Sequence, residues 1–161
     1  MFVSVIACFC LALFTGVSGQ SCPQRWQASF DGFCYLTSNQ FLAWSAARMY
    51  CKEMGGDLVK ITSARENEYV LALARKELPQ MKQVWIGLQW IENGIYWADY
   101  SALSYTNWAP NEPNGGANEP CGHMWIGHAT NLPGRASGFW NDIGCDANAG
   151  LPNGIVCKRL P

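Results

Sequence analysis

The sequence runs Trp108-Ala-Pro-Asn-Glu-Pro-Asn114, then Glu119-Pro-Cys121, then Trp140-Asn-Asp-Ile-Gly-Cys145, and these three segments decide the fold. They carry five side chains with a carboxylate or amide oxygen: Glu112, Asn114, Glu119, Asn141 and Asp142. Calcium in proteins takes roughly 6–8 oxygen ligands of these kinds. The segments therefore predict a calcium site with coordination positions left open for a ligand. A solvated turn is the alternative for any one of them taken alone.

The three segments, in this order and flanked by cysteines, resemble the carbohydrate-recognition domain of the C-type lectins. The resemblance covers residues 22–157, which is nearly the whole chain after its first segment. It implies an α+β fold in which two helices pack on small antiparallel sheets and a long loop binds calcium, the implied cofactor. It also implies the disulfides of the long form of this domain: Cys22–Cys34, Cys51–Cys157 and Cys121–Cys145.

In this family the motif Glu-Pro-Asn accompanies mannose-type sugars, and here it reads Glu112-Pro113-Asn114. The resemblance implies a cis peptide bond before Pro113, whereas an ordinary turn would have a trans bond. All five oxygen-bearing residues are implied metal ligands, and Asp142 chiefly adds charge to the ion. The other four are also implied to bind the sugar: Glu112, Asn114, Glu119 and Asn141.

Two departures from the family pattern are expected to reshape the rim of the site and hence the choice of oligosaccharide. Pro120 precedes Cys121 where the family usually has Asn or Asp, and the segment 128–139 makes the next interval longer than usual. Gly115-Gly116 supplies no oxygen side chain where a second calcium ion is often held. No auxiliary calcium site is therefore predicted.

The first 19 residues differ in composition from the rest, because they contain no Asp, Glu, Lys or Arg. Their apolar run is shorter than the roughly 20 residues that a membrane-spanning helix needs, and it ends in the small residues Gly16-Val-Ser-Gly19. The pattern predicts a secretory signal peptide over residues 1–19, followed by one domain over residues 20–161. We therefore expect a secreted, extracellular protein with no membrane span.

The predicted export decides how the cysteines are interpreted. Cys8 and Cys10 would leave with the signal peptide, and an even set remains from the 8 cysteines of the chain. In an oxidising compartment an even set predicts disulfides, although spacing alone leaves many pairings open. A zinc site is the alternative, and it is disfavoured because the chain has no Cys-x-x-Cys spacing.

The charge pattern excludes some partners. The formal net charge is −1, from 11 basic and 12 acidic residues, and neither sign forms a run. No basic face for nucleic acid or for an anionic membrane is expected. The sequence shows no collagen-like period or heptad array either, so no stalk indicates an oligomer.

A first helix is predicted over residues 41–52, where apolar residues recur at helical spacing. Thr37 and Gln40 have the spacing of a capping box before it, and Gly55-Gly56 is expected to end it.

A second helix is predicted to begin at Ser63, which has capping-box spacing to Glu66, and to end before Pro79. Within the apolar run 85–88, Gly87 marks a place where another backbone could approach. Short strands are predicted over residues 26–30 and 33–36 around the turn Asp31-Gly32, and over residues 85–88, 95–97, 122–126 and 154–158.

These observations favour a secreted calcium-dependent lectin that binds mannose-type glycans (mannose, N-acetylglucosamine, fucose) in the recognition of microbes or cell surfaces. The alternative is a module of the same fold that binds a protein or another non-sugar ligand, including ice, and that alternative predicts loss of the calcium ligands. An enzyme with Glu112 and Glu119 as the acid/base pair of a glycosidase is disfavoured, because the two acids would share a metal. No catalytic residue is expected.

Overall fold

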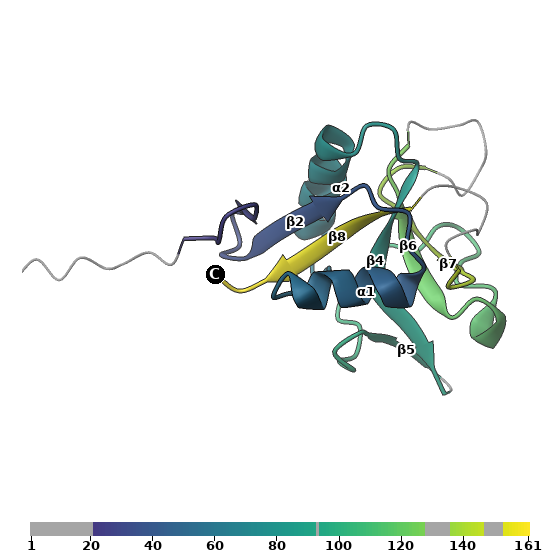
Figure 1. The fold of residues 1–161 in the computed structure, drawn as a ribbon. Coiled ribbons are helices and arrows are strands. Elements are labelled where there is room, and N and C mark those ends of the chain that lie inside the picture. Colours follow the sequence, from purple (N-terminus) through teal and green to yellow (C-terminus); the bar gives the residue numbers. More distant parts are fainter. Residues whose placement is uncertain (1–20, 93, 128–135, 147–152) are drawn as a thin grey trace, which may run out of the picture.

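The computed structural model describes residues 21–92, 94–127, 136–146 and 153–161 (Figure 1). The predicted signal peptide at 1–19 lies outside the described residues, as does most of the segment 128–139. The elements in chain order are β1 (Gln27–Ala28), β2 (Cys34–Ser38), α1 (Trp44–Glu53), β3 (Asp57–Leu58), α2 (Ala64–Glu77), β4 (Gln83–Ile91), β5 (Gly94–Trp97), the 3-10 helix η1 (Gly116–Asn118), β6 (Cys121–Trp125), β7 (Trp140–Ile143) and β8 (Asn153–Arg159).

The predicted α+β class is confirmed, but the described strands form one sheet and not several small ones. Its order is β1-β2-β8-β4-β6-β7, with β3 also paired to β8 and β5 to β4. All pairs are antiparallel except β4 with β8, which run parallel. The first described residues and the C-terminus lie at one end of the molecule, and β7 lies at the other (Figure 1).

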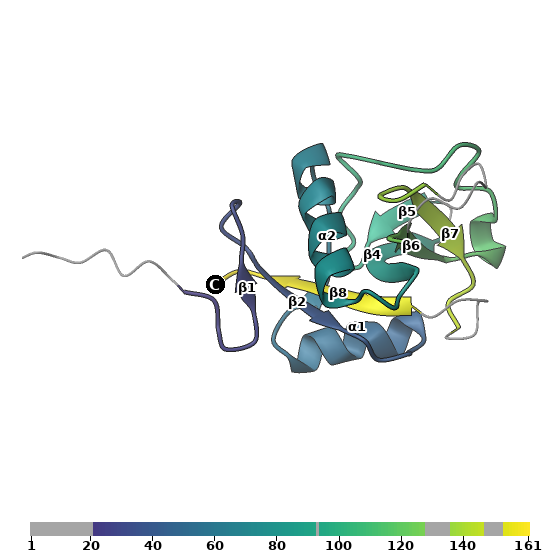
Figure 2. The same cartoon turned by 90° about the horizontal axis from the view of Figure 1, so that it is seen from above.

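The strand β8 separates two hydrophobic cores, because successive side chains of a strand point to opposite faces. Val156 packs into the core that holds the buried side of α2, whereas Ile155 and Cys157 pack into the core that holds α1. Figure 2 shows the two helices on opposite sides of the β2–β8 pair. A strand buried on both faces explains why residues 154–157 form a continuous apolar run with no polar alternation.

Helix α1 begins later than predicted, and the proposed capping box of Thr37 and Gln40 is wrong. Thr37 lies inside β2, and the N-cap residue Ala43 makes no side-chain cap. The free N–H of Trp44 instead donates to the backbone carbonyl of Cys145 (2.8 Å), so a distant loop caps this helix. The helix ends as predicted, at Gly55 with φ of 87°.

Helix α2 follows its prediction closely. The Ser63 hydroxyl oxygen accepts from the N–H of Glu66 (3.2 Å), and the Glu66 carboxylate accepts from the N–H of Thr62 (2.8 Å). Both halves of the predicted cap are therefore present, although the second reaches one residue further back.

Gly87 confirms the predicted close approach of two backbones. Its N–H donates to the carbonyl of Val59 (2.9 Å), and a Cβ at this position would stand only 3.1 Å from the carbonyl oxygen of Leu58. Its own carbonyl accepts from the N–H of Ala98 (2.7 Å). A side chain here would push β4 away from the β3 segment.

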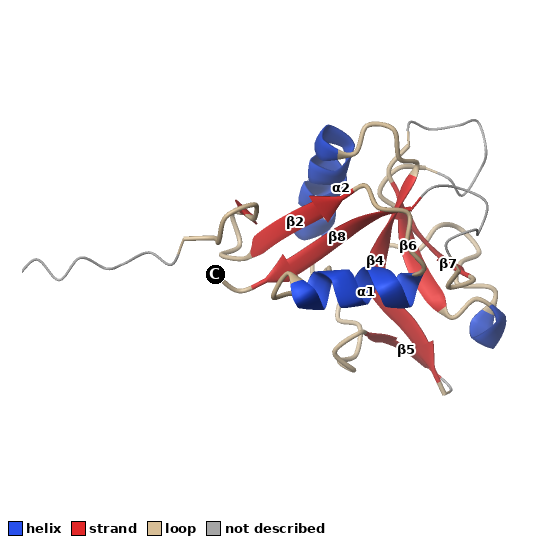
Figure 3. Cartoon of the chain, in the orientation of Figure 1, coloured by secondary structure: helices blue, strands red, loops and turns tan. Residues whose placement is uncertain are grey.

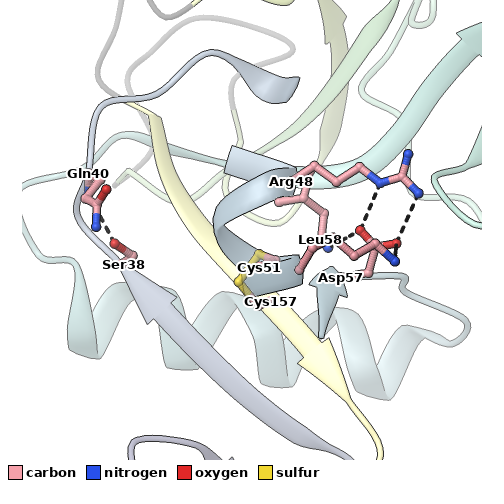
Figure 4. Close-up of a disulfide and its surroundings, with 8 residues drawn as sticks. Ser38, Gln40, Arg48, Cys51, Asp57, Leu58 and Cys157 are labelled. Carbon is pink, nitrogen blue, oxygen red and sulfur yellow. Dashed lines mark hydrogen bonds and ion pairs between the residues drawn. A yellow bond between two sulfur atoms is a disulfide. The ribbon is translucent and has the colours of Figure 1, made fainter. Parts of the chain in front are cut away.

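The three predicted disulfides are all formed: Cys22–Cys34, Cys51–Cys157 and Cys121–Cys145. Figure 4 shows the second of them joining α1 to β8, close to the ion pair between Arg48 and Asp57. The third joins the start of β6 to the residues after β7, so it closes the segment that carries Asn141 and Asp142. Over the described residues, no helix has the length and apolar character needed to cross a membrane.

One predicted strand is shorter and another is shifted, and two strands, β3 and β7, were missed. The first hairpin is present around Asp31-Gly32, but its first strand is only Gln27–Ala28. The predicted strand at 122–126 is β6, beginning one residue earlier. The strand β7 was not predicted, because Trp140-Asn141-Asp142 was interpreted only as part of a ligand loop.

Candidate functional site

The predicted ligands come from a loop, a short helix end and a strand. Glu112 and Asn114 lie in the connection between β5 and β6, and Glu119 directly follows η1. Figure 3 shows this connection in tan, with η1 as its short blue helix. Asn141 and Asp142 lie on β7, opposite His123 and Gly122 of β6. Both peptide segments are therefore attached to one sheet.

Asp142 joins these segments. Its side chain is buried, and its two carboxylate oxygens accept from the backbone N–H groups of Asn114 (3.1 Å) and Gly115 (2.9 Å). The peptide bond between Glu112 and Pro113 is cis, as predicted. Hydrogen bonds to an ionised acceptor are stronger than neutral ones, so Asp142 holds the loop onto β7.

Gly115 makes room for Glu119. A Cβ on Gly115 would overlap the Cβ, Cγ and Oε2 atoms of the Glu119 side chain. The backbone N–H groups of Asn118 and Glu119 donate to Gly115 and Gly116, which winds η1 and turns Glu119 back over the loop. From the sequence, Gly115 was considered only as a position without an oxygen-bearing side chain, and its packing role was missed.

Electrostatics in the site is dominated by three carboxylates. Burial, together with the adjacent Asp142 and Glu119 carboxylates, raises the pKa of Glu112 to about 7. Burial and the charge of Asp142 also raise the pKa of Glu119. The Oε2 atom of Glu112 is buried and accepts no hydrogen bond from the described residues. Like charges held this close favour binding of a proton or a cation.

The donor set fits calcium better than any soft metal, because it consists of carboxylate and amide oxygens without a thiolate. The orphaned, buried oxygen of Glu112 is the feature that a cation would satisfy. Among the described residues, however, no group of three or more His, Cys, Asp or Glu side chains is gathered closely enough to hold a metal. The Asn141 amide donates to the backbone carbonyl of Asp142, so the pairing of Asn141 with Glu119 stays a prediction.

Trp140 supports the site from within the core. It is fully buried, and the rings of Trp97, Tyr105 and Trp108 pack edge-on around it at 5.6–5.9 Å between centroids. Its backbone accepts from the N–H of Ala109 (2.8 Å), so strand β7 and the Glu112 loop are also tied here. Trp140 is therefore a core residue beneath the predicted ligands and not a ligand itself.

Asn67 of α2 holds the Trp140 indole, which sequence reasoning missed. Its Oδ1 accepts from Trp140 Nε1 (2.7 Å), and its Nδ2 donates to the carbonyl of Gly138 (3.0 Å). Asn107 donates to the same carbonyl (2.7 Å). The available signal for this role was an asparagine inside the predicted second helix, on the side of its apolar residues. An amide that is buried there needs hydrogen-bond partners.

Replacing Asn67 by alanine is expected to lower the free energy of unfolding by about 2–3 kcal/mol, because it leaves the buried Trp140 N–H without its acceptor. Chemical denaturation would measure the change. Asn39→Ala, at an exposed asparagine, is the matched control and is expected to shift stability by less than about 0.5 kcal/mol. Equal stability of the two variants would contradict the role of Asn67.

Comparison with known proteins identifies the family to which this fold belongs. The profile described as "Lectin C-type domain" matches residues 40–159, which is most of the chain. The chain belongs to this family of C-type lectin domains. The members of this family are not enzymes, so membership confirms that the chain is not an enzyme. The resemblance inferred from the three segments is confirmed with it.

Several relatives share most of this C-type lectin domain. The perlucin-like protein of Mytilus galloprovincialis is 36% identical over 140 residues, covering 85% of this chain and 82% of that protein. The low affinity immunoglobulin epsilon Fc receptor of Mus musculus is 35% identical over 148 residues, covering 90% of this chain but only 39% of the receptor. The chain thus spans less than half of that receptor.

Among solved structures, the cow C-type carbohydrate-recognition domain of CD23 is similar over the whole fold. That structure was determined in the presence of a GlcNAc2Man3 oligosaccharide. It matches with a TM-score of 0.70 and 33% identity, covering 88% of this chain and 97% of that one. The C-type lectin domain described here therefore shares its architecture with a carbohydrate-recognition domain whose structure was determined in the presence of that oligosaccharide.

Proposed function

We propose that this chain is a secreted lectin that binds mannose-type glycans through one calcium ion, in the recognition of microbes or cell surfaces. The observation that carries the proposal is the Asp142 carboxylate, which holds the Glu112-Pro113-Asn114 loop against β7. It brings acidic and amide side chains from two distant segments to one place. The orphaned Glu112 oxygen in this place supports a cation as the missing partner.

Sugar hydroxyls are well hydrated, so a protein must offer them more than single hydrogen bonds. A bound calcium ion would coordinate two neighbouring hydroxyls directly. The Glu112 and Glu119 carboxylates would accept hydrogen bonds from those hydroxyls. The amide groups of Asn114 and Asn141 would donate to them, so each hydroxyl meets one acceptor and one donor.

Secretion is the second part of the proposal. The three disulfides support it, because such bonds persist in oxidising compartments and are rare in the cytosol. The segment that would direct export, residues 1–19, has the composition of a signal peptide cleaved after Gly19. Mass spectrometry of the exported chain would locate the new N-terminus.

Calcium-dependent retention on mannose-agarose tests the central claim. The domain is expected to bind the resin in calcium, to elute with EDTA, and to bind free mannose with a Kd of about 1 mM, because one ion and two hydroxyls bury little surface. Retention that is unchanged in EDTA would rule out the calcium site. Failure to bind any glycan on an array, in calcium, would rule out the lectin.

The double variant Glu112→Gln with Asn114→Asp tests which residues line the sugar site. It exchanges carboxylate and amide around Pro113 while keeping shape and formal charge, so calcium is expected to bind still. Mannose binding is expected to fall at least tenfold, roughly 1.5 kcal/mol or more, since the sugar meets a donor at position 112 where it needs an acceptor, and an acceptor at position 114 where it needs a donor. A variant that keeps both calcium and full mannose affinity would place the sugar elsewhere.

A protein ligand is the second candidate function, and the name of one relative favours it. The murine relative is called an immunoglobulin epsilon Fc receptor, although this chain covers 39% of it. A protein-binding module would keep its partner after glycosidase treatment of that partner and in EDTA. A lectin would lose it in both conditions.

A further inference from the structure

The side chain of Glu119 is held in place without hydrogen bonds of its own. It is half-buried beside the Asp142 carboxylate, and none of the described residues donates a hydrogen bond to it. A carboxylate that is meant to meet an ion has to be fixed by other means. For Glu119 these means are the packing against Gly115 and the chain segment that carries it.

The backbone on each side of Glu119 is tied to a neighbouring segment. The N–H of Trp90 in β4 donates to the carbonyl of Pro120 (2.8 Å), directly beyond the last β4–β6 pair. On the other side, the N–H of Glu119 donates to the carbonyl of Gly116 (3.1 Å), where η1 begins. The direction of the Glu119 side chain thus depends on β4 and on the start of η1.

The indole of Trp90 packs next to the start of η1. Gly116 has a left-handed backbone (φ 55°), and a Cβ placed on it would stand 3.9 Å from the Cζ2 atom of Trp90. Trp90, Glu119 and Asp142 also line one small space of about 10 Å³, which is room for about one water molecule. The indole is therefore packed closely against the segment that carries the predicted ligand.

The β4–β5 hairpin fixes the indole in turn. Trp90 Nε1 donates to the carbonyl of Glu92 (3.1 Å), which follows it in the chain. Trp90 also pairs with Ile95 across the two strands. Since side chains opposite one another share a face of the sheet, Trp90 and Ile95 lie on one side of the hairpin and Tyr96 lies on the other. The indole thus has a fixed place before any ligand binds.

We propose that Trp90 is a positioning residue for Glu119, and that it strengthens calcium binding by holding this carboxylate in place before the ion arrives. The role rests on the calcium site proposed above. Groups that orient a metal ligand without touching the metal typically change metal affinity by about 10–100-fold. Trp90 acts in this way, through the backbone of η1 and of Pro120.

Calcium titration of Trp90→Ala tests this role. The variant keeps the backbone N–H that donates to Pro120 and removes only the indole, so it is expected to fold, as thermal unfolding curves would show. Its Kd for calcium is expected to rise at least about tenfold. Tyr96→Ala, an exposed aromatic residue on the other face of the same hairpin, is the matched control and is expected to stay within about twofold of the wild type.

A second background separates positioning of Glu119 from a general loosening of the domain. In Glu119→Gln, the charge that Trp90 would hold in place is gone. Adding Trp90→Ala to this variant is therefore expected to weaken calcium binding by less than about twofold. An equal loss in the wild-type and Glu119→Gln backgrounds would overturn the proposal, as would a folded Trp90→Ala that binds calcium like the wild type.

Hydrogen exchange in EDTA tests the positioning without any ion. In Trp90→Ala the N–H of Glu119 is expected to exchange at least about tenfold faster, because its bond to Gly116 loosens. The N–H groups of Asn114 and Gly115, which donate to Asp142, are expected to keep their rates. An unchanged rate at Glu119 would overturn the inference even with the calcium site established. If the wild type bound no calcium, the proposed function would fail, and the exchange rates would still decide whether Trp90 holds Glu119.

Discussion

Replacing Asp142 by asparagine is expected to weaken calcium binding by at least about 100-fold and to abolish calcium-dependent sugar binding. The variant removes one negative charge from the proposed ligand set. It also replaces a carboxylate that accepts from two backbone N–H groups by an amide with a single acceptor oxygen. One of the two N–H groups, at Asn114 or Gly115, then faces an NH2 group, so the loop loosens from β7.

Isothermal titration with calcium would measure the loss, and Asp146→Asn is the matched control. Asp146 is an exposed acid four residues further along the chain and is not a predicted ligand. Its variant is expected to bind calcium as the wild type does. If the folded Asp142→Asn domain bound calcium within a few-fold of the wild type, the assignment of the site would be wrong.

The stability of the calcium-free domain is expected to fall as pH rises from 5 to 8. The pKa of Glu112 is raised from 4.5 to about 7 in the folded chain, by burial and by the Asp142 and Glu119 carboxylates. The folded state therefore holds a proton that the unfolded state has already released. The stabilising contribution is complete below the unfolded pKa and is lost as pH passes through about 7.

Calcium is expected to reverse this trend, because it binds the ionised carboxylates and competes with protons. At pH 8, calcium at about 100 times its Kd is expected to raise Tm by roughly 8–10 °C, and at pH 5 by much less. Melting curves recorded by circular dichroism in EDTA and in calcium would show both effects. In EDTA, the Glu112→Gln variant is expected to lose most of the pH dependence of its stability. A stability profile identical to that of the wild type would show that Glu112 is not its cause.

Local sequence rules predicted the elements whose causes are local. The cap of α2 at Ser63, the end of α1 at Gly55, and the close approach at Gly87 each depend on one residue type in one backbone conformation. The cap of α1 was mispredicted because its acceptor is the carbonyl of Cys145, about 100 residues away in the chain. A contact of this range leaves no signal in the residues that flank the helix.

The ligand set and the disulfide pairing were predicted from the family resemblance, because local spacing alone left both of them open. The parts of the site that were missed are those that support the ligands. Asn67 acts through hydrogen bonds to Trp140 and Gly138, which are far away in the sequence. Gly115 acts by leaving room for the side chain of Glu119, which is close in the sequence. Strand β7 was missed because Asn and Asp are uncommon in strands, and here the sheet position of Trp140 overrides that preference.

The placement of the first described residue and of the C-terminus has a practical consequence for avidity. Residues 21 and 161 leave the domain on the side away from η1 and β7 (Figures 1 and 2). A bead, a lipid or a scaffold joined at either end would leave the Glu112 loop facing outward. Several domains held side by side would then meet a glycan-coated surface together, and the effective concentration of the later contacts would multiply a weak single-site affinity by about 100-fold or more.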